Sequence, residues 1–344
     1  MTLAERLRER IRRDGPLSFR DWMEACLYDL DEGYYMRPGR KTGADAATDF
    51  ATNPTLHPFF AQCVAREVLE ARQALGEPEE FAVFEFGGGE GDLARDAQAW
   101  LRHRRVEVPW YHIETSPHHR QAQAGGGAVN AIDAIGAIDA LPQGATGMVV
   151  AHEFLDALPL RWLERSEAGW SEVFVDWQDG FVERLLATSD VPPFALPIGQ
   201  RVAWMQDAEA WLEGVAAVMP RGRVLVVDYG REAPWRAELH GTVRTFRRHQ
   251  QAGSPLDAPG DKDITASVDF AWLREAAAAV GLPQLRDESQ EAFLLRHHVL
   301  SALNALDRDS ASGASEYLRL RHMLIPHGGG MGDAFRVALF ERAA

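Results

Sequence analysis

The sequence predicts an α/β fold built on a doubly wound parallel sheet, and three neighbouring features predict it. Residues 81–86 are an apolar run of strand length, interrupted only by Glu85. Three glycines follow at alternate positions, Gly87, Gly89 and Gly91. Residues 93–101 then begin a helical pattern. A buried strand, a glycine turn and a helix N-terminus form the first half of a nucleotide-binding, Rossmann-like βαβ unit.

The segment before this unit, residues 1–78, predicts a helical N-terminal extension. Thr2 and Glu5 form a capping box at the start of a helix with one apolar face. Further helices are expected over residues 19–28 and 56–75. Because the Arg-rich N-terminus fits a capped helix, we interpret it as structure and not as a transit peptide.

The charge of the glycine turn discriminates between nucleotide cofactors. Its spacing is E-x-G-x-G-x-G, whereas the dinucleotide fingerprint is G-x-G-x-x-G. Glu90 and Asp92 lie inside the turn, where a pyrophosphate would meet negative charge. S-adenosylmethionine carries a sulfonium, an ammonium and no phosphate, so the turn favours it over NAD.

Acidic residues end the next two predicted strands. Residues 106–114 form a strand that ends in Glu114, roughly twenty residues past the glycine turn, where an acid is placed to bind the ribose hydroxyls. A solvated carboxylate at a strand end is the alternative. A third, weaker strand over residues 128–132 is closed by Asp133. That carboxylate is placed to reach the adenine amino group, although a plain turn acid fits equally well.

The remaining chain continues the alternation of strands and helices, so that one catalytic domain spans residues 79–344. Residues 147–153 and 223–230 are the clearest strands. Residues 291–296 and 334–340 are also expected to be strands of the sheet. The alternation implies a parallel sheet that binds ligands at the carboxyl ends of its strands.

Two additions to the sheet are expected on the ligand side. The first is an insertion at about residues 160–220, which combines a helix over residues 203–218 with antiparallel strands joined by a hairpin signal at residues 178–180. The second, at about residues 231–270, begins with a stretch rich in glycine, proline and polar residues and is typical of an active-site cover.

Composition excludes several classes of partner. The net charge of −15 argues against a nucleic-acid backbone, which requires clustered basic residues, and is compatible with a basic substrate. No apolar run approaches the roughly 18 residues of a membrane span. Cys26 and Cys63 are too few for a disulfide scaffold, so a reducing cytoplasm is the expected location. No histidine or cysteine cluster has metal-ligand spacing, and no metal is expected.

The strand over residues 147–153 is followed by the segment in which catalytic groups are expected. Glu153 and Asp156 lie three residues apart just past this buried strand, and their carboxylates can converge on one substrate group. A guanidinium is the group that paired carboxylates match best. The alternative is structural: Asp156 caps a short helix, and Glu153 pairs with a nearby arginine.

These motifs, in this order, resemble the MidA-like family of class I S-adenosylmethionine-dependent methyltransferases, whose mitochondrial members methylate an arginine of a respiratory complex I subunit. The similar segments span nearly the whole chain: residues 27–35, 49–52, 85–91, 152–159, 228–230, 241–249 and 263–270. Tyr34 and Tyr35 belong to the first segment, so they either line the site or pack the turn. Three residues depart from the family pattern. Gly88 replaces a usual proline, His152 a usual asparagine and Ser267 a usual histidine.

The resemblance implies a class I methyltransferase fold with a helical N-terminal extension and an inserted lobe. It implies methyl transfer from S-adenosylmethionine to an arginine nitrogen. The implied catalytic residues are Glu153, Asp156, Asp228 and His249. The implied cofactor-binding residues are Glu85, Gly87, Gly89, Gly91, Glu114, Asp133 and His152. A carboxylate must orient the protonated guanidinium and accept charge or a proton during transfer.

Other functions stay open at this point. A small-molecule methyltransferase keeps the enzyme class and changes the acceptor. An assembly factor that binds S-adenosylmethionine without transferring a methyl group is the alternative from another class, and the replacement at His152 is what favours it. The expected partner is a protein with a methylatable arginine, with a complex I subunit as the candidate that the resemblance supplies. A homodimer is one alternative for the oligomeric state.

Overall fold

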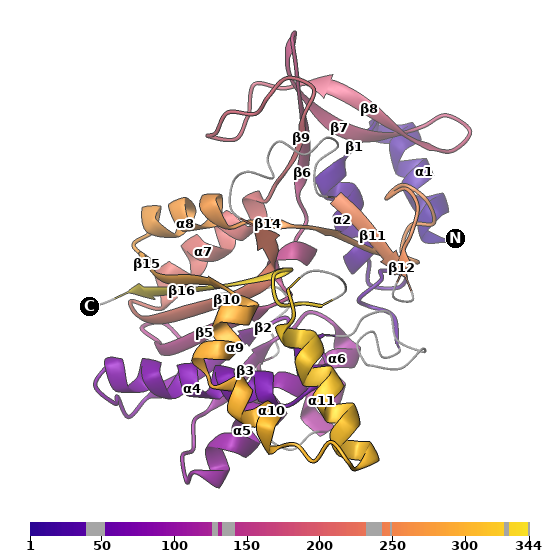
Figure 1. The fold of residues 1–344 in the computed structure, drawn as a ribbon. Coiled ribbons are helices and arrows are strands. Elements are labelled where there is room, and N and C mark those ends of the chain that lie inside the picture. The colour runs from indigo at the N-terminus through magenta and orange to yellow at the C-terminus, as the bar shows by residue number, and fades with distance from the viewer. Residues whose placement is uncertain are drawn as a thin grey trace.

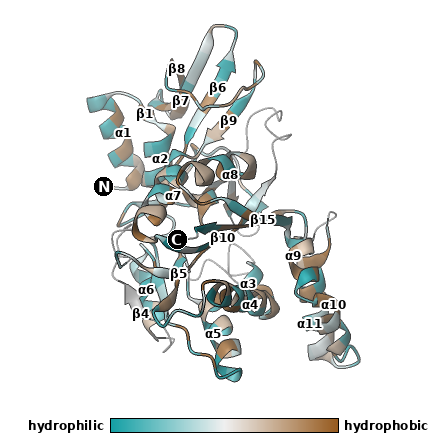
Figure 2. Cartoon of the chain, turned by 90° about the vertical axis from the view of Figure 1, so that its left-hand side faces the viewer, coloured by the Kyte–Doolittle hydropathy of each residue, from teal (hydrophilic) through white to brown (hydrophobic). Residues whose placement is uncertain are grey.

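The computed structural model describes residues 1–38, 52–125, 130–132, 142–231, 243–247, 250–326 and 330–342. Within these residues, helices cover both faces of a central sheet, and a lobe of antiparallel strands stands at one end of it (Figure 1). A view turned by 90° places this lobe and the helices near the C-terminus at opposite ends of the molecule (Figure 2).

The central sheet has the strand order β15-β16-β10-β5-β2-β3-β4 in the described part of the chain. Its strands are β2 (Phe81–Phe86), β3 (Trp110–Ile113), β4 (Asn130–Ile132), β5 (Thr146–His152), β10 (Arg221–Arg231), β15 (Gln284–Ser289) and β16 (Phe335–Arg342), and β14 (Val268–Asp269) pairs with β10. The five strands from β10 to β4 run parallel, whereas β16 is antiparallel to both of its neighbours. The chain order reverses between β2 and β5. Ligands of such sheets bind at the carboxyl ends of these strands.

This topology confirms the predicted α/β class with a doubly wound sheet, and β2, β5 and β10 lie where strands are predicted. One prediction is wrong. Residues 291–296 belong to helix α9 (Gln290–Arg296), and the strand of this region is β15, directly before it. Ser289 begins the helix, because its side chain accepts the backbone N–H of Ala292. The apolar run is buried by helix packing, with Phe293 and Leu294 inaccessible to solvent.

Side chains of the sheet alternate between two apolar layers. Met148 and Val150 of β5 face the layer built by α4 (Phe59–Ala74), α5 (Asp92–His103) and α9. Val149 and Ala151 face the layer that includes α7 (Gln206–Val218) and α8 (Phe270–Ala279). Both faces of β5 are therefore buried, as expected for a central parallel strand.

The N-terminal helices pack against the inserted lobe. The lobe consists of β6 (Arg161–Ser166), β7 (Gly169–Trp177), β8 (Phe181–Ala187) and β9 (Arg201–Trp204). Because β9 extends to Trp204, the helix predicted from residue 203 begins only at Gln206, as α7. Strand β1 (Leu17–Ser18) pairs antiparallel with β7. The helices α1 (Leu3–Asp14) and α2 (Phe19–Tyr28) flank β1, and the capping box of Thr2 and Glu5 is confirmed. Trp22 is buried against Phe181, with ring centroids 4.6 Å apart.

The helix predicted over residues 56–75 begins three residues later than predicted, as α4 at Phe59. Leu56 instead ends a separate short helix, α3 (Asn53–Leu56), and His57 after it has an extended backbone with φ −158°. Pro58 follows His57, and the helical conformation is disfavoured for a residue before a proline.

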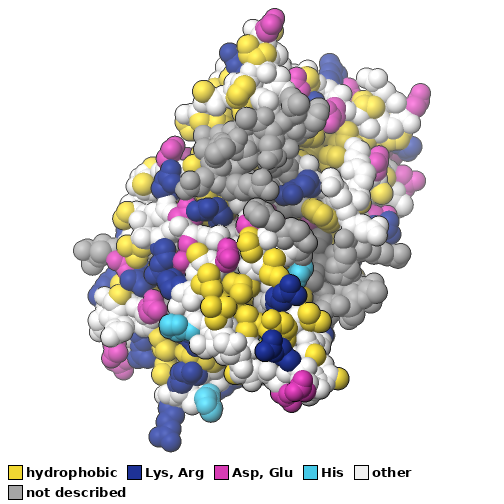
Figure 3. Space-filling model, viewed as in Figure 1, with side chains coloured by type: hydrophobic (Ala, Val, Ile, Leu, Met, Phe, Trp, Pro, Cys, Tyr) yellow, Lys and Arg dark blue, Asp and Glu magenta, His cyan; other side chains and the backbone are white. Residues whose placement is uncertain are grey.

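The remaining elements lie on either side of the sheet. The predicted cover contains a small sheet of β11 (Val243–Arg247), β12 (Gln250–Gln251) and β13 (Asp263–Ala266). The other helices are η2 (Leu155–Ala157), α6 (Pro117–Gly125), α10 (Val299–Ala305) and α11 (Ala311–Leu324). On the face shown in Figure 3, hydrophobic side chains gather in the lower half, where α9, α10 and α11 lie in Figure 1. Among the described residues, no helix has the length and apolar character needed to cross a membrane.

Candidate active site

A cavity of about 910 Å³ opens at the carboxyl ends of the central strands. Its walls come from the glycine turn after β2, the segment after β5, helix α2 and the small sheet of β11 and β13. Most of the predicted site residues line it: Glu85, Gly87, Gly89, Glu114, His152, Glu153 and Asp156. Gly91 and Asp228 lie behind this wall. Asp133 and His249 fall outside the described residues.

The glycine turn has a backbone that other residues rarely adopt. Gly87, Gly89 and Gly91 have φ values of 65°, 54° and 80°, and Gly91 is the N-cap of α5. A β-carbon placed on Gly89 would meet no atom of the described residues within 4 Å. At this residue the turn therefore leaves space for the close approach of a cofactor to its backbone.

Glu114 ties the turn to the end of β3. Its Oε2 accepts the backbone N–H of Gly89 at 3.2 Å, and its Oε1 accepts that of Ser116 at 2.9 Å. On the other side, Gln123 donates to the carbonyl of Gly89 at 2.6 Å. The carboxylate of Glu114 lies on the cavity wall at the end of β3. A ribose hydroxyl could replace one of its two backbone N–H donors.

Glu85 lies beneath the turn. It is 2% exposed, and the indole N–H of Trp110 donates to its Oε2 at 2.7 Å. Burial raises the pKa of Glu85 to about 8, and the neighbouring Glu114 and Asp92 act in the same direction. Glu85 is therefore a largely protonated acid at neutral pH, at the edge of the cavity.

Two acids follow β5 and face the cavity. Glu153 has a left-handed backbone with φ 49°, an unusual conformation for a non-glycine residue. Burial raises the pKa of its carboxyl well above the usual value, and repulsion from Asp156 and Asp228 adds to this. The hydroxyl of Thr265 donates to Oδ2 of Asp156 at 2.8 Å, and burial raises the pKa of Asp156 to about 6. Raised carboxyl pKa values in a cleft are typical of functional sites.

Asp228 holds the backbone of this segment. Its Oδ2 accepts the N–H groups of Phe154, Leu155 and Asp156 at 3.2, 2.9 and 3.3 Å. Its Oδ1 accepts the N–H of Tyr229 at 2.8 Å. Both oxygens are thus occupied by backbone donors, and Asp228 is fully buried. This geometry supports the loop that presents Glu153 and Asp156.

His152 ends β5 and lines the cavity. Its ring packs against Phe60 and lies parallel to Phe335, with centroid distances of 5.0 and 6.2 Å. Its Nε2 is 3.3 Å from Oε1 of Glu153 and 3.5 Å from the amide nitrogen of Asn53. Burial lowers the pKa of His152 to about 3, so the ring is neutral.

Sequence reasoning missed part of the opposite wall. Tyr28 and Tyr35 stack with ring centroids 5.7 Å apart, and both line the cavity. The Tyr28 hydroxyl donates to the carbonyl of Ala157, and that of Tyr35 to Oδ1 of Asp263, at 2.9 and 2.8 Å. The resemblance indicated Tyr35 as a lining residue. Tyr34 is instead buried in the core.

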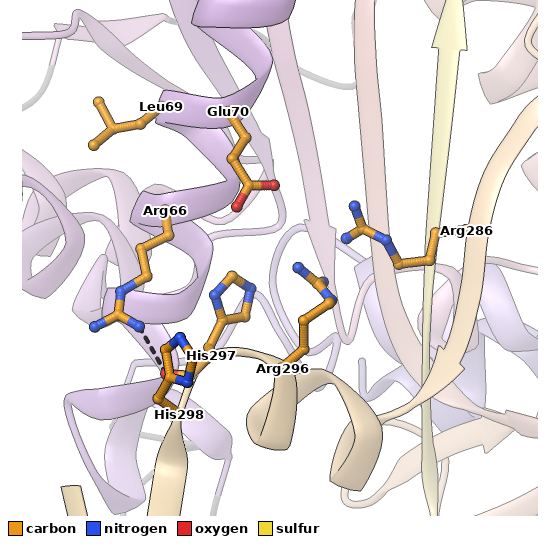
Figure 4. A pocket seen from close by; sticks show the side chains of 7 residues that line it. All are labelled: Arg66, Leu69, Glu70, Arg286, Arg296, His297 and His298. Atoms are coloured by element: carbon orange, nitrogen blue, oxygen red, sulfur yellow. Dashed lines mark hydrogen bonds between the residues drawn. The ribbon is translucent and has the colours of Figure 1, made fainter. Parts of the chain in front are cut away.

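A second cavity, of about 470 Å³, lies between α4 and α9 (Figure 4). Arg66 donates to the carbonyl of His297 at 2.7 Å. The buried Oε1 of Glu67 lies 3.0 Å from Arg286, 2.7 Å from Arg296 and 2.9 Å from His297. Burial acts to raise the pKa of Glu67, but its cationic neighbours outweigh burial and hold the pKa at about 2. Through Glu67 the cluster connects α4, β15 and α9. Arg286 and Arg296 are both paired with the carboxylate of Glu67.

Comparison with known families decides the class of protein. Residues 63–286 match the model of a family described as putative S-adenosyl-L-methionine-dependent methyltransferases. The chain belongs to this family. This confirms the predicted family and the predicted preference for S-adenosylmethionine over NAD, and it makes the protein a methyltransferase that uses this cofactor.

A solved structure extends the match to the whole fold. A likely methyl transferase from Burkholderia thailandensis, bound to S-adenosyl-homocysteine, is 31% identical. It superposes with a TM-score of 0.88, over 99% of this chain and 92% of that one. The class I methyltransferase fold is therefore confirmed.

Curated relatives correct the expected location. A Drosophila melanogaster protein named as a mitochondrial protein arginine methyltransferase is 27% identical over 98% of this chain and 85% of its own length. The human protein of the same type is 25% identical over 97% and 82%. Because these relatives are named mitochondrial, the expected cytoplasmic location is wrong. A low cysteine count does not distinguish the cytoplasm from other reducing compartments.

Proposed function

We propose that this methyltransferase transfers a methyl group to an arginine nitrogen of a protein. The observation that carries the proposal is the convergence of three carboxyl groups, those of the buried Asp156 and Asp263 and of the partly buried Glu153, on one cavity in front of the cofactor turn. A guanidinium offers five N–H donors in one plane and matches such acceptors better than other side chains do.

The aromatic wall supports the same acceptor. Tyr28 and Tyr35 line the cavity as a stacked pair, and guanidinium groups stack on aromatic faces. The hydroxyl groups of both tyrosines already donate to protein acceptors, so their rings are held in place. In this arrangement the carboxylates bind the N–H groups and an aromatic ring covers the plane of the guanidinium.

The mechanism that follows is an in-line transfer with loss of one proton. S-adenosylmethionine supplies the methyl group on a cationic sulfur. Glu153 and Asp156 orient the acceptor nitrogen toward that methyl group, which is where most of the rate enhancement of such a reaction arises. As the nitrogen gains the methyl group, Glu153 in its ionised form accepts the proton that the nitrogen loses. The raised pKa of Glu153 favours this uptake.

The other predicted residues take supporting roles in this proposal. Asp228 is a positioning residue, because its four backbone hydrogen bonds fix the loop that presents the acids. Glu114 binds the ribose, and Gly89 leaves room for the cofactor, whereas a β-carbon on Gly87 would lie 2.9 Å from the ring of Phe154. The ribose role of Glu114 is supported by its place at the end of β3 beside the turn.

The names of the curated relatives, together with the resemblance to the MidA-like family, support a protein acceptor. A respiratory complex I subunit is the candidate that the resemblance supplies. A homodimer is compatible with this proposal.

Identifying the labelled product tests the proposal. The enzyme is incubated with S-adenosylmethionine tritiated on the methyl group and with a protein extract from cells that lack this methyltransferase. The labelled protein is then hydrolysed to amino acids. We expect radioactive methylarginine with the wild type and with Glu80→Gln, an exposed control, and none with Glu153→Gln.

Three results would contradict the proposal. Label in methyllysine or another methylated amino acid would change the acceptor residue. Label confined to small molecules would favour the small-molecule alternative. Binding of S-adenosylmethionine without any transfer would favour an assembly factor.

A further inference from the structure

One buried histidine beneath the cofactor turn has no role in the mechanism. His112 lies on β3 directly opposite Glu85 of β2. Its side chain is inaccessible to solvent, and burial lowers the pKa of His112 to about 4, so the ring is neutral. Neither ring nitrogen forms a hydrogen bond with the described residues, although Nδ1 lies 3.2 Å from Oε2 of Glu85. Hydrogen bonding therefore gives this buried ring little stabilisation, and its packing against the turn is the feature that explains its position.

The ring occupies the space under the turn. A β-carbon built on Gly88 would lie 2.4 Å from Nδ1 of His112 and 3.1 Å from the carboxyl carbon of Glu85. A β-carbon on Gly91 would lie 3.4 Å from Nε2 of the same ring. There is therefore no room for a side chain at residue 88, whereas there is free space at Gly89, on the cavity side of the turn.

We infer that His112 is a positioning residue for the cofactor turn, and that the turn rests on its ring. From the cavity side, the turn is held by Glu114 through the N–H of Gly89. A ribose bound to Glu114 competes for the same carboxylate. The contact with His112 lies on the opposite side and does not involve the ligand, so it keeps the turn in place when Glu114 changes partners.

This inference makes Gly88 and His112 energetically coupled. A methyl group at residue 88 displaces either the turn or the imidazole ring, and the ring has no free space because it is fully buried. Removing the ring should restore that space. The effect of Gly88→Ala on cofactor affinity must therefore be larger with His112 present than with alanine at residue 112.

A double-mutant cycle on the full chain tests the coupling. S-adenosylmethionine is titrated by calorimetry into the wild type, Gly88→Ala, His112→Ala and the double variant, and the urea midpoint of each is measured. We expect Gly88→Ala to weaken binding at least about tenfold, or about 1.4 kcal/mol. The double variant should recover most of that loss relative to His112→Ala. Gly180→Ala is the control, because a β-carbon there, unlike one on Gly88, meets no atom of the described residues within 4 Å, and Gly180 lies outside the cavity.

Two results would overturn the inference. One is a Gly88→Ala variant that binds as tightly as the wild type. The other is a double variant that binds no better than Gly88→Ala. If Gly88→Ala does not fold, recovery of folding in the double variant supports the coupling, and failure to recover contradicts it. In a transfer assay, His112→Ala should raise the KM for S-adenosylmethionine more than it lowers kcat, which a general loss of folded protein would not produce.

Discussion

Replacing Asp156 by asparagine should stabilise the methyltransferase while it impairs catalysis. Asp156 is 7% exposed, and burial raises its pKa from 3.8 to about 6. A folded-state pKa above the unfolded value means that the folded protein binds the proton more tightly. Stability is therefore lost as the pH rises from 3.8 through about 6, and above pH 6 the loss is complete.

The size of the effect follows from the shift. A change from 3.8 to about 6 corresponds to about 3 kcal/mol of destabilisation by the ionised carboxyl above pH 6. Asparagine removes this ionisation and can still accept the hydrogen bond of Thr265. We expect Asp156→Asn to raise the free energy of unfolding by about 2–3 kcal/mol at pH 8, by about half as much at pH 5, and by nearly nothing below pH 3.8.

Urea unfolding at several pH values measures this difference. Asp309→Asn, at an exposed position, is the matched control, and its stability should follow the wild type at every pH. A stability difference between Asp156→Asn and the wild type that does not change with pH would refute the reasoning. Methyl transfer by Asp156→Asn should fall, because the variant presents one carboxylate fewer to the acceptor.

Three further predictions concern other acids. Glu114→Gln should weaken S-adenosylmethionine binding about 10- to 100-fold in calorimetry, while the exposed Glu107→Gln has no effect, and equal affinities would exclude the ribose contact. Asp228→Asn should lower the free energy of unfolding by about 3 kcal/mol in urea, because backbone N–H groups lose their acceptors, and an unchanged urea midpoint would contradict its positioning role. Glu67→Gln should cost about 3 kcal/mol at pH 7, since it leaves Arg286 and Arg296 without a buried carboxylate. With the pKa held at about 2 in the fold, the wild type should lose that stabilisation only as the pH falls from 4.5 toward 2, and retention of it at pH 2 would exclude the ion-pair network.

Local patterns in the sequence predicted the ligand side of the sheet well. The run over residues 81–86 is apolar except at Glu85 and is buried on both faces as β2, and the alternate glycines correspond to three left-handed backbone conformations. The strand predicted at residues 291–296 was wrong, because a short apolar run fits a strand or a buried helix equally well. Ser289, three residues before Ala292, was the available signal for a helix start.

Contacts between segments that are distant in the chain could not be predicted from the sequence. The pairing of β1 with β7 joins residues 17–18 to residues 174–175, and no local pattern indicates it. Asp263 reaches the cavity only through β13, and Tyr28 reaches it through α2. His112 carried no signal either, because a lone histidine on a strand gives no indication that a turn rests on it.

The most direct test of the whole account is a calorimetric titration of S-adenosylmethionine into the wild type, Gly89→Ala and Gly199→Ala. Gly89 and Gly199 have left-handed backbones, with φ 54° and 84°, and a β-carbon on either would lie more than 4 Å from every atom in the described part of the chain. Each alanine therefore introduces a similar backbone strain, of about 1–2 kcal/mol, but only residue 89 faces the cavity. We predict that Gly89→Ala loses S-adenosylmethionine binding while Gly199→Ala keeps it. Equal binding by the two variants would contradict the placement of the cofactor on this turn.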